Sequence, residues 1–249
     1  MDKISIVTVT YNCKNDVEKT IKSVLDLNYP NIEYIVIDGA SKDGTVDIIK
    51  TYADRIDYWI SEPDKGIYDA MNKGIVAATG EWIYFLNAGD CFDDKDVLHK
   101  VPFDNYSQTT AVCAIVGDIK VNIDNNLSVR KKTIPFYRNQ RRYKNMGFSH
   151  QGVFVRTKEA KNLLFDLQYA LCADYAMMVS LHKKGLSFIE IDTPICAIQG
   201  GVGASASNRD QQMREEARIC GCEDTIIFYA TYCVRKAKRF IKNIIEVKR

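Results

Sequence analysis

The sequence predicts an α/β protein whose central sheet is mostly parallel and flanked by helices, with a helical segment at the C-terminus. Three observations carry this prediction. Strand-like and helix-like segments alternate as β-α-β-α-β-α-β through the first 87 residues, the pattern of a parallel sheet with helices on both faces. The strand-like segments are almost continuously apolar, as in strands buried on both faces. Polar or acidic residues follow each of them, at the edge where such sheets bind ligands.

The elements of the first half follow from hydrophobic periodicity. Residues 4–10, ISIVTVT, are β-branched almost throughout and predict the first strand. Apolar residues at helical spacing after Asp16 predict a helix that ends before Pro30. The other strands of this half are expected at 32–39, 56–61 and 82–87, and the other helices begin near Ser41 and at Gly66.

The second half alternates less regularly. We expect strands at 109–121, 127–134 and 186–198 and helices at 157–164 and 173–185. Two interpretations stay open for the Gly-Gly-Val-Gly segment at 200–203. It is a lid over a ligand, because glycines absorb large dihedral changes, or it is an ordinary connection. From Asn208 a helical tail is expected to run to the end, interrupted near Gly221.

Composition limits the classes of function. A chain of 249 residues that is 46% hydrophobic and 27% charged suits one α/β domain with elaborations. No apolar stretch approaches the ~20 residues of a membrane span, and a net charge of +2 predicts no nucleic-acid partner. The N-terminus shows no signal peptide, and the eight cysteines form no C-x-x-C pair. We therefore expect a cytoplasmic protein with free thiols.

No glycine-rich phosphate loop follows the first strand. The stretch VTYNCKND holds no glycine, which disfavours a Rossmann dehydrogenase, and the sequence G-x-x-x-x-G-K-[ST] is also absent. A bound phosphate would need another partner, and a divalent metal held by carboxylates is the obvious substitute. Asp90, at the end of FLNAGD, can supply a carboxylate to Mg²⁺ or Mn²⁺. The alternative is that Asp90 caps a helix that follows it.

Several segments together resemble the family 2 glycosyltransferases with a GT-A fold. They are SIVTVTYN, IEYIVIDGASKDGT, SEPDKGIYDAMNKGIVAATGEWIYFLNAGD, GFSHQGVFVR and CADYAMMVSLHKKG. The resemblance implies a GT-A domain over 1–207, in which residues 1–95 bind a nucleotide sugar and residues 96–207 bind the acceptor, followed by a basic helical tail at 208–249. It also implies inverting transfer of a sugar to an acceptor hydroxyl, with a UDP-hexose or UDP-N-acetylhexosamine as the expected donor.

The resemblance assigns roles to the polar residues at the strand ends. Nucleotide-sugar contacts are implied for Thr10, Tyr11, Asn12, Asp38, Asp69, Lys73, Asn87, Ala88 and Gly89. Asp38 lies where the family hydrogen-bonds the base, although it could instead only initiate the turn with Gly39. Asp90 aligns with the metal-binding acid of the family's D-x-D region. The acids usual at 87 and 89 are Asn and Gly here, so the metal would have one protein carboxylate.

Asp174, in CADYAMM, matches the family's general base. An inverting transfer needs one carboxylate to accept the proton of the attacking hydroxyl. The alternative is that Asp174 is an N-cap, because it lies at the start of a predicted helix. The resemblance also implies that His150, in FSHQGVF, contacts the acceptor or the diphosphate, with a structural hydrogen bond as the alternative.

Two other classes stay open beside the transferase. One is a nucleotide-sugar enzyme such as a nucleotidyltransferase, whose glycine-rich opening loop is missing here. The other is a nucleotide-sugar-binding protein without transferase activity, against which Asp90 and Asp174 argue. A transfer assay with labelled UDP-sugar separates all three.

The C-terminal residues are strongly basic. Residues 235–249 hold seven Lys or Arg and one Glu, and apolar residues from Val234 onward fall at helical spacing. Such a helix lies on an anionic membrane surface, or it packs on its own domain with a solvated basic face. Together with the resemblance, the first interpretation predicts a peripheral protein at the inner face of the cell membrane. Its acceptor would be a lipid-linked glycan of capsule, O-antigen or exopolysaccharide synthesis.

Overall fold

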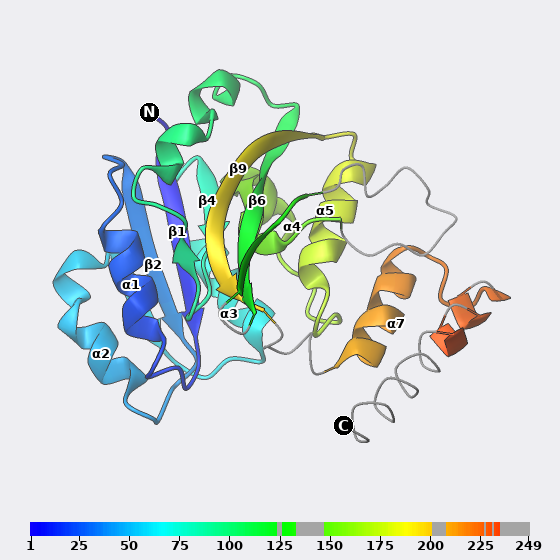
Figure 1. Cartoon of the computed structure of the whole chain (residues 1–249), viewed down its shortest axis with the longest axis horizontal. Coiled ribbons are helices and arrows are strands. Elements are labelled where there is room, and N and C mark those ends of the chain that lie inside the picture. The colour runs from blue at the N-terminus through cyan, green and yellow to red at the C-terminus, as the bar shows by residue number, and fades with distance from the viewer. Residues whose placement is uncertain (124–125, 133–146, 201–207, 227, 231, 235–249) are drawn as a thin grey trace.

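The computed structural model describes residues 1–123, 126–132, 147–200, 208–226, 228–230 and 232–234. Figure 1 shows a central sheet with α1 and α2 on one side and the helices of the second half beyond it, ending in α7. The helices are α1 Val17–Leu25, α2 Thr45–Thr51, α3 Ile67–Ala77, α4 Thr157–Leu163, α5 Ala173–Lys183 and α7 Arg209–Ile219. The strands are β1 Ile4–Thr10, β2 Ile32–Asp38, β3 Tyr58–Ser61, β4 Trp82–Phe85, β5 Cys91–Phe92, β6 Val112–Ile123, β7 Asn126–Arg130, β8 Val153–Arg156 and β9 Ser187–Gln199.

The predicted α/β class is confirmed. The strands follow the order β3-β2-β1-β4-β8-β6-β9-β5, and β7 pairs with β6. The first four of these pair in parallel. Beyond them the sheet is mixed, because β8 is antiparallel to both β4 and β6, whereas β6 and β9 are parallel. The sequence patterns predict neither β5, which has two residues, nor β8, which has four.

The sheet is buried on both faces, as the apolar strand sequences predict. Alternate residues of β1 belong to different hydrophobic clusters: Val7 packs with α3, α4 and α5, and Ile6 packs with α1 and α2. Helix α3 lies very close to β1, because a Cβ on Gly74 would come within 2.4 Å of Val7 Cγ1. This close packing places the start of α3 near the carboxyl end of β1.

The strand register brings the polar strand ends together. Thr10 of β1 pairs with Asp38 of β2, which pairs with Ser61 of β3. On the other side of β1 the ladder continues past β4, where the Ala88 N–H donates to the carbonyl of Val9 at 3.3 Å. The carboxyl ends of the four parallel strands therefore form one edge, as the sequence predicts.

The C-terminal helical region is interrupted as expected. Gly221 has a φ of 66° and follows the end of α7. The predicted amphipathic helix beyond residue 234 and most of the 200–203 segment lie outside the described residues, and the predicted division at residues 95 and 207 stays a prediction. None of the helices in the described part of the chain has the length and apolar character of a membrane span.

Candidate active site

A cleft of about 680 Å³ opens at the carboxyl ends of β1 and β4. Strand order reverses here, since β2 lies on one side of β1 and β4 on the other, and open α/β sheets bind ligands at such a point. Of the predicted residues, Thr10, Tyr11, Asn87 and Ala88 line the cleft. Tyr11 is 65% exposed, so its ring offers a face on which a base can stack.

Two oxygen atoms of the cleft wall have unsatisfied hydrogen-bonding capacity. Thr10 Oγ1 and Asn87 Oδ1 are buried and have no hydrogen-bond partner in the described part of the chain. Both residues line the cleft, at the ends of neighbouring strands. Because buried polar atoms are normally paired, the cleft is suited to a ligand that carries hydroxyl or N–H groups.

Asp38 and Asn12 fix the loops around this cleft. Asp38 is fully buried, and its Oδ2 accepts hydrogen bonds from the Ser41 N–H at 2.9 Å and from Ser61 Oγ at 2.6 Å. Asn12, with a φ of 50°, donates its N–H to Ser41 Oγ at 2.8 Å. Asp38 therefore initiates the turn at Gly39, and its contact with a base stays a prediction.

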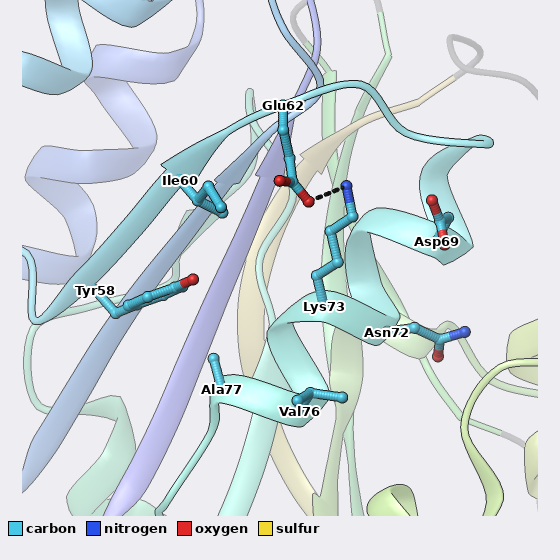
Figure 2. A pocket seen from close by; sticks show the side chains of 8 residues that line it. All are labelled: Tyr58, Ile60, Glu62, Asp69, Asn72, Lys73, Val76 and Ala77. Carbon is cyan, nitrogen blue, oxygen red and sulfur yellow. Dashed lines mark ion pairs between the residues drawn. The ribbon is translucent and has the colours of Figure 1, made fainter.

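Asp69 and Lys73 line a second cavity, of about 550 Å³, between β3 and α3 (Figure 2). Lys73 Nζ lies 2.8 Å from Glu62 Oε1 and 2.5 Å from Asp64 Oδ1. Asp69 Oδ2 accepts the Lys65 N–H at 2.9 Å and so fixes the start of α3. Because Asp64 lines the first cleft, Lys73 acts on that cleft through Asp64, and direct nucleotide-sugar contacts of Asp69 and Lys73 stay predictions.

The Asn87–Asp90 turn is held against α1 by one hydroxyl group. Thr20 Oγ1 accepts the Gly89 N–H at 2.9 Å and donates to the carbonyl of Asp90 at 2.8 Å. Gly89 has a φ of 99°, which side-chain-bearing residues rarely adopt, so the backbone favours glycine where the family has an acid. The interpretation of Asp90 as a helix cap is wrong, because strand β5 begins at the next residue.

Asp90 is a buried carboxylate suited to a cation. It is 9% exposed, and burial raises its pKa to about 6, against the opposing effects of His150, Lys19 and a hydrogen bond from Gln151. Among the described residues, no three His, Cys, Asp or Glu side chains form a metal-binding cluster. A hard divalent cation nevertheless binds through one or two protein oxygens and completes its shell with water and phosphate. Asp90, with the unpaired Oδ1 of Asn87, fits that requirement.

A second set of polar side chains surrounds Asp174. The Tyr68 hydroxyl donates to Asp174 Oδ1 at 2.9 Å, and His150 Nδ1 lies 3.0 Å from Asp174 Oδ2. On the other side of the imidazole, Asn87 Nδ2 lies 3.4 Å from His150 Nε2. In the neutral tautomer of His150 that carries its proton on Nδ1, Nε2 can accept a hydrogen bond from Asn87. These contacts connect the Asp174 cluster to the wall of the cleft at the ends of β1 and β4.

The environment of Asp174 keeps it ionised. Burial acts to raise its pKa, but the hydrogen bond and charge of His150, with hydrogen bonds from the Tyr175 N–H and Tyr68, outweigh burial and lower the pKa from its ordinary value. Asp174 is not the N-cap of α5, because that position belongs to Cys172. The predicted structural hydrogen bond of His150 is present, and its contact with acceptor or diphosphate stays a prediction.

Two residues around Asp174 were not predicted. Tyr68 lies within the segment GIYDAMNKG, which is part of the family resemblance. The sequence gives its place in the chain but does not show that its side chain points toward Asp174. Glu215 of α7 is 5% exposed and accepts the N–H groups of Ala170, Leu171 and Cys172 at 3.2, 2.9 and 3.0 Å. Its Oε1 also accepts from Gln211 Nε2 at 2.9 Å within α7, but its contacts to backbone N–H groups leave no signal in the sequence. Glu215 fixes the segment that leads into Asp174.

The comparisons with known proteins agree with this geometry. A sequence model of glycosyl transferase family 2 matches residues 5–164, which is more than half of the chain. The protein belongs to glycosyl transferase family 2.

Curated relatives match less than half of the chain. An uncharacterized glycosyltransferase of Mycobacterium tuberculosis is 42% identical over 96 residues, which are 38% of this chain and 37% of that protein. TuaG of Bacillus subtilis, a glycosyltransferase assigned to teichuronic acid biosynthesis, is 37% identical over 100 residues, 39% of each chain. The matched segment thus spans well under half the length of these relatives.

Solved structures share the fold over most of the chain. TarS 1-349 of S. aureus in complex with UDP-GlcNAc has a TM-score of 0.68 at 16% identity, covering 89% of this chain and 66% of that one. The mannosyltransferase PcManGT of Pyrobaculum calidifontis, in complex with GDP-Man and Mn²⁺, has a TM-score of 0.65 at 18% identity, covering 88% and 63%. These likenesses establish the GT-A fold for this chain.

Proposed function

We propose that the protein is an inverting glycosyltransferase that moves a sugar from a UDP-sugar to an acceptor hydroxyl. The observation that carries the proposal is the contact between the two halves of the site. Asn87 lines the nucleotide cleft, and its amide lies 3.4 Å from the imidazole that is paired with Asp174. A donor in the cleft therefore ends beside an ionised carboxylate, as displacement at an anomeric carbon requires.

The nucleotide occupies the cleft at the ends of β1 and β4. The exposed ring of Tyr11 stacks on the base. Thr10 Oγ1 and Asn87 Oδ1, which have no hydrogen-bond partner among the described residues, accept hydrogen bonds from the nucleotide sugar or would coordinate an ion bound with it. Asp64, held by Lys73 at 2.5 Å, presents a fixed carboxylate to ribose or base donors. Solved structures that share this fold hold UDP-GlcNAc in one case and GDP-Man in another. We assign UDP because the family resemblance implies it; the donor is then a UDP-hexose or UDP-N-acetylhexosamine.

Asp90 would hold a divalent ion, Mn²⁺ or Mg²⁺, and Asn87 Oδ1 would supply a second protein oxygen. When bound, the ion supplies positive charge next to the departing diphosphate. The protein's own contribution is to keep the carboxylate buried and oriented, through the turn that Thr20 fastens to α1. Burial raises the pKa of Asp90 to about 6 because it disfavours the ionised carboxylate. A bound cation would offset that cost and so stabilise the ionised form.

Asp174 is the general base. Its lowered pKa keeps it ionised at neutral pH, and the attacking acceptor hydroxyl passes its proton to the carboxylate as the new bond forms. His150 and Tyr68 hold the two carboxylate oxygens, at 3.0 and 2.9 Å, and so orient it toward the sugar. Single displacement inverts the anomeric centre, so an α-linked donor gives a β-linked product.

The acceptor is proposed to be a lipid-linked glycan of surface-polysaccharide synthesis, handled at the inner face of the cell membrane. Support comes from the similarity to a glycosyltransferase assigned to teichuronic acid biosynthesis and from the seven basic residues of 235–249. These residues suit an anionic surface.

The test is a transfer assay with a panel of labelled UDP- and GDP-sugars, using lipid-linked glycan extracts and soluble sugar acceptors in detergent. We expect Mn²⁺- or Mg²⁺-dependent transfer from one UDP-sugar, with a β-linked product by NMR. Transfer from GDP-sugars alone, or retention of the α configuration, would refute the assignment.

A further inference from the structure

The chain after α7 folds back as a second helical segment. Residues 226, 228–230 and 232–234 are helical, and Thr225 caps their start, since its Oγ1 accepts the Phe228 N–H at 3.2 Å. Between the helices, the Cys222 N–H donates to the carbonyl of Ala217 at 2.9 Å and Gly221 has a φ of 66°. This is a glycine-terminated helix end, so the new segment begins in a fixed direction.

One face of this segment is fastened to α7. Phe228 is 3% exposed and packs with Ala217 and Cys222. Tyr232, one turn further on, lies under the guanidinium of Arg214, 5.4 Å from the ring centre. The segment therefore has a defined inner face and cannot rotate without breaking these contacts.

The opposite face is an exposed apolar stripe. Ile226 is 87% exposed, Tyr229 55% and Val234 54%. Together with the exposed Ala230 and Cys233, they occupy positions i, i+3, i+4, i+7 and i+8, which form a single stripe on a helix. We call these five residues the outer stripe. A contiguous exposed apolar patch of this kind marks a site of interaction.

The sequence that follows identifies the surface that the outer stripe fits. Apolar residues continue at the same helical spacing at 237, 241, 244 and 245, and residues 235–249 carry seven Lys or Arg against one Glu. This charge is complementary to an anionic leaflet, where each cation near the surface contributes favourably. A second copy of the chain would instead bring the same basic segment against itself, because a two-fold interface pairs identical patches.

We propose that the outer stripe docks on the surface of an anionic membrane, with Phe228 and Tyr232 holding the rest of the protein above it. The inference deepens the proposed function and rests on its lipid-linked acceptor. The docked surface would also be connected to Asp174 through α7. Helix α7 lies beside α5 (Figure 1), and Glu215 of α7 fixes the segment that leads into Asp174.

The test is co-sedimentation of the full chain with phosphatidylcholine vesicles made with or without phosphatidylglycerol. We compare wild type with Ile226→Asn and Tyr229→Asn, which alter exposed side chains, and with Leu127→Asn as the matched control. Leu127 is 59% exposed on β7, away from the outer stripe. We expect binding only to the anionic vesicles, unchanged by Leu127→Asn and reduced roughly tenfold or more by Ile226→Asn, since a buried Ile side chain contributes ~1.5–3 kcal/mol.

Three outcomes would overturn the inference. Ile226→Asn sediments like wild type, wild type binds neutral vesicles equally well, or wild type binds neither kind of vesicle; in that case light scattering shows whether Ile226→Asn converts an oligomer to a monomer. Such a conversion would identify the outer stripe as a contact between copies. Transfer to a soluble acceptor in detergent separates this failure from failure of the proposed function, because the Ile226→Asn protein should retain that activity at the wild-type level.

Discussion

The two parts of the site are built in different ways. The cleft is lined mainly by residues that follow the ends of β1, β2 and β4, together with Gly66, Ile67 and Ala70 at the start of α3. The Asp174 cluster is assembled from α3, the turn at His150, α5 and α7, through contacts such as Tyr68 to Asp174, 106 residues apart. The position of the cleft therefore follows mainly from the topology of the sheet, and the Asp174 cluster depends on packing between distant elements.

This difference predicts where mutations act. The cleft should control how tightly the donor binds, because its polar groups face the ligand. The Asp174 cluster should control the rate of the chemical step, because its members orient one carboxylate. Substitutions that affect only donor affinity or only kcat would support the division, and mixed effects would break it.

The largest expected effect is that of Asp174→Asn. Loss of the general base should lower kcat by roughly 10²–10⁴-fold and leave UDP affinity by calorimetry unchanged. Tyr68→Phe is the matched control, since it removes one hydrogen bond to the same carboxylate and should lower kcat far less. Near-normal kcat in the Asp174→Asn protein would exclude Asp174 as the base.

The second-largest effect is expected for a substitution of Asp90, on the cleft side of the site. Asp90→Asn should weaken Mn²⁺-dependent UDP binding by at least the roughly 10- to 100-fold that loss of a supporting group costs a metal site. Metal-independent UDP binding should be unaffected, because base and ribose contacts remain. Calorimetry that gives equal UDP affinity for both proteins in Mn²⁺ would remove Asp90 from the metal site.

Glu215 tests whether α7 contributes to the chemistry. Glu215→Ala leaves three backbone N–H groups without their acceptor. Only the contact to Cys172 is fully buried, and leaving that N–H unpaired costs about 1–3 kcal/mol. The displaced segment leads into Asp174, so kcat should fall by up to ~10²-fold while KM for the donor stays constant. Glu215→Gln keeps an acceptor oxygen and should recover most of kcat. Equal losses in both variants, or a change in KM alone, would argue against a positioning role.

The comparison of the cleft with the Asp174 cluster also shows which parts of the structure can be predicted from the sequence. The β-branched run at 4–10 and the polar residues after it predict β1 and the cleft, because strand periodicity and parallel topology are local signals. Asp174 is found through its motif, but Glu215, which binds the segment before it, is not, because a carboxylate that binds backbone N–H groups imposes no pattern on those residues. Gly89 looks like a departure from the metal motif until its φ of 99° gives the backbone reason.

At the amino ends of the parallel strands, opposite the cleft, a substitution should change the stability of the protein without changing the site. Glu33 is 8% exposed and accepts hydrogen bonds from Ser5, Thr79 and Lys3. Burial acts to raise its pKa, but these bonds outweigh burial and lower it from 4.5 to about 2.

The folded state therefore binds this proton less readily than the unfolded state does. Its stabilisation is present above pH 4.5 and is lost as the pH falls toward 2. Glu33→Gln should lower the free energy of unfolding at pH 7 by about 2–3 kcal/mol, with the difference shrinking below pH 4.5 and UDP affinity intact. Urea titrations that show a constant difference at every pH would contradict this.

The smallest effect is expected at the contact between the two halves. Asn87→Asp replaces the donor in a hydrogen bond to His150 that is already long, at 3.4 Å, so the loss should cost no more than about 1 kcal/mol. The new carboxylate lies three residues from Asp90 and adds a second anionic ligand for the ion. The variant should fold, bind Mn²⁺ more tightly and transfer sugar within about tenfold of wild type, since about 1 kcal/mol corresponds to roughly fivefold in rate. A folded, metal-binding but inactive protein would show instead that the amide is needed for a specific contact with the donor, and that Asn87 belongs to both halves of the site.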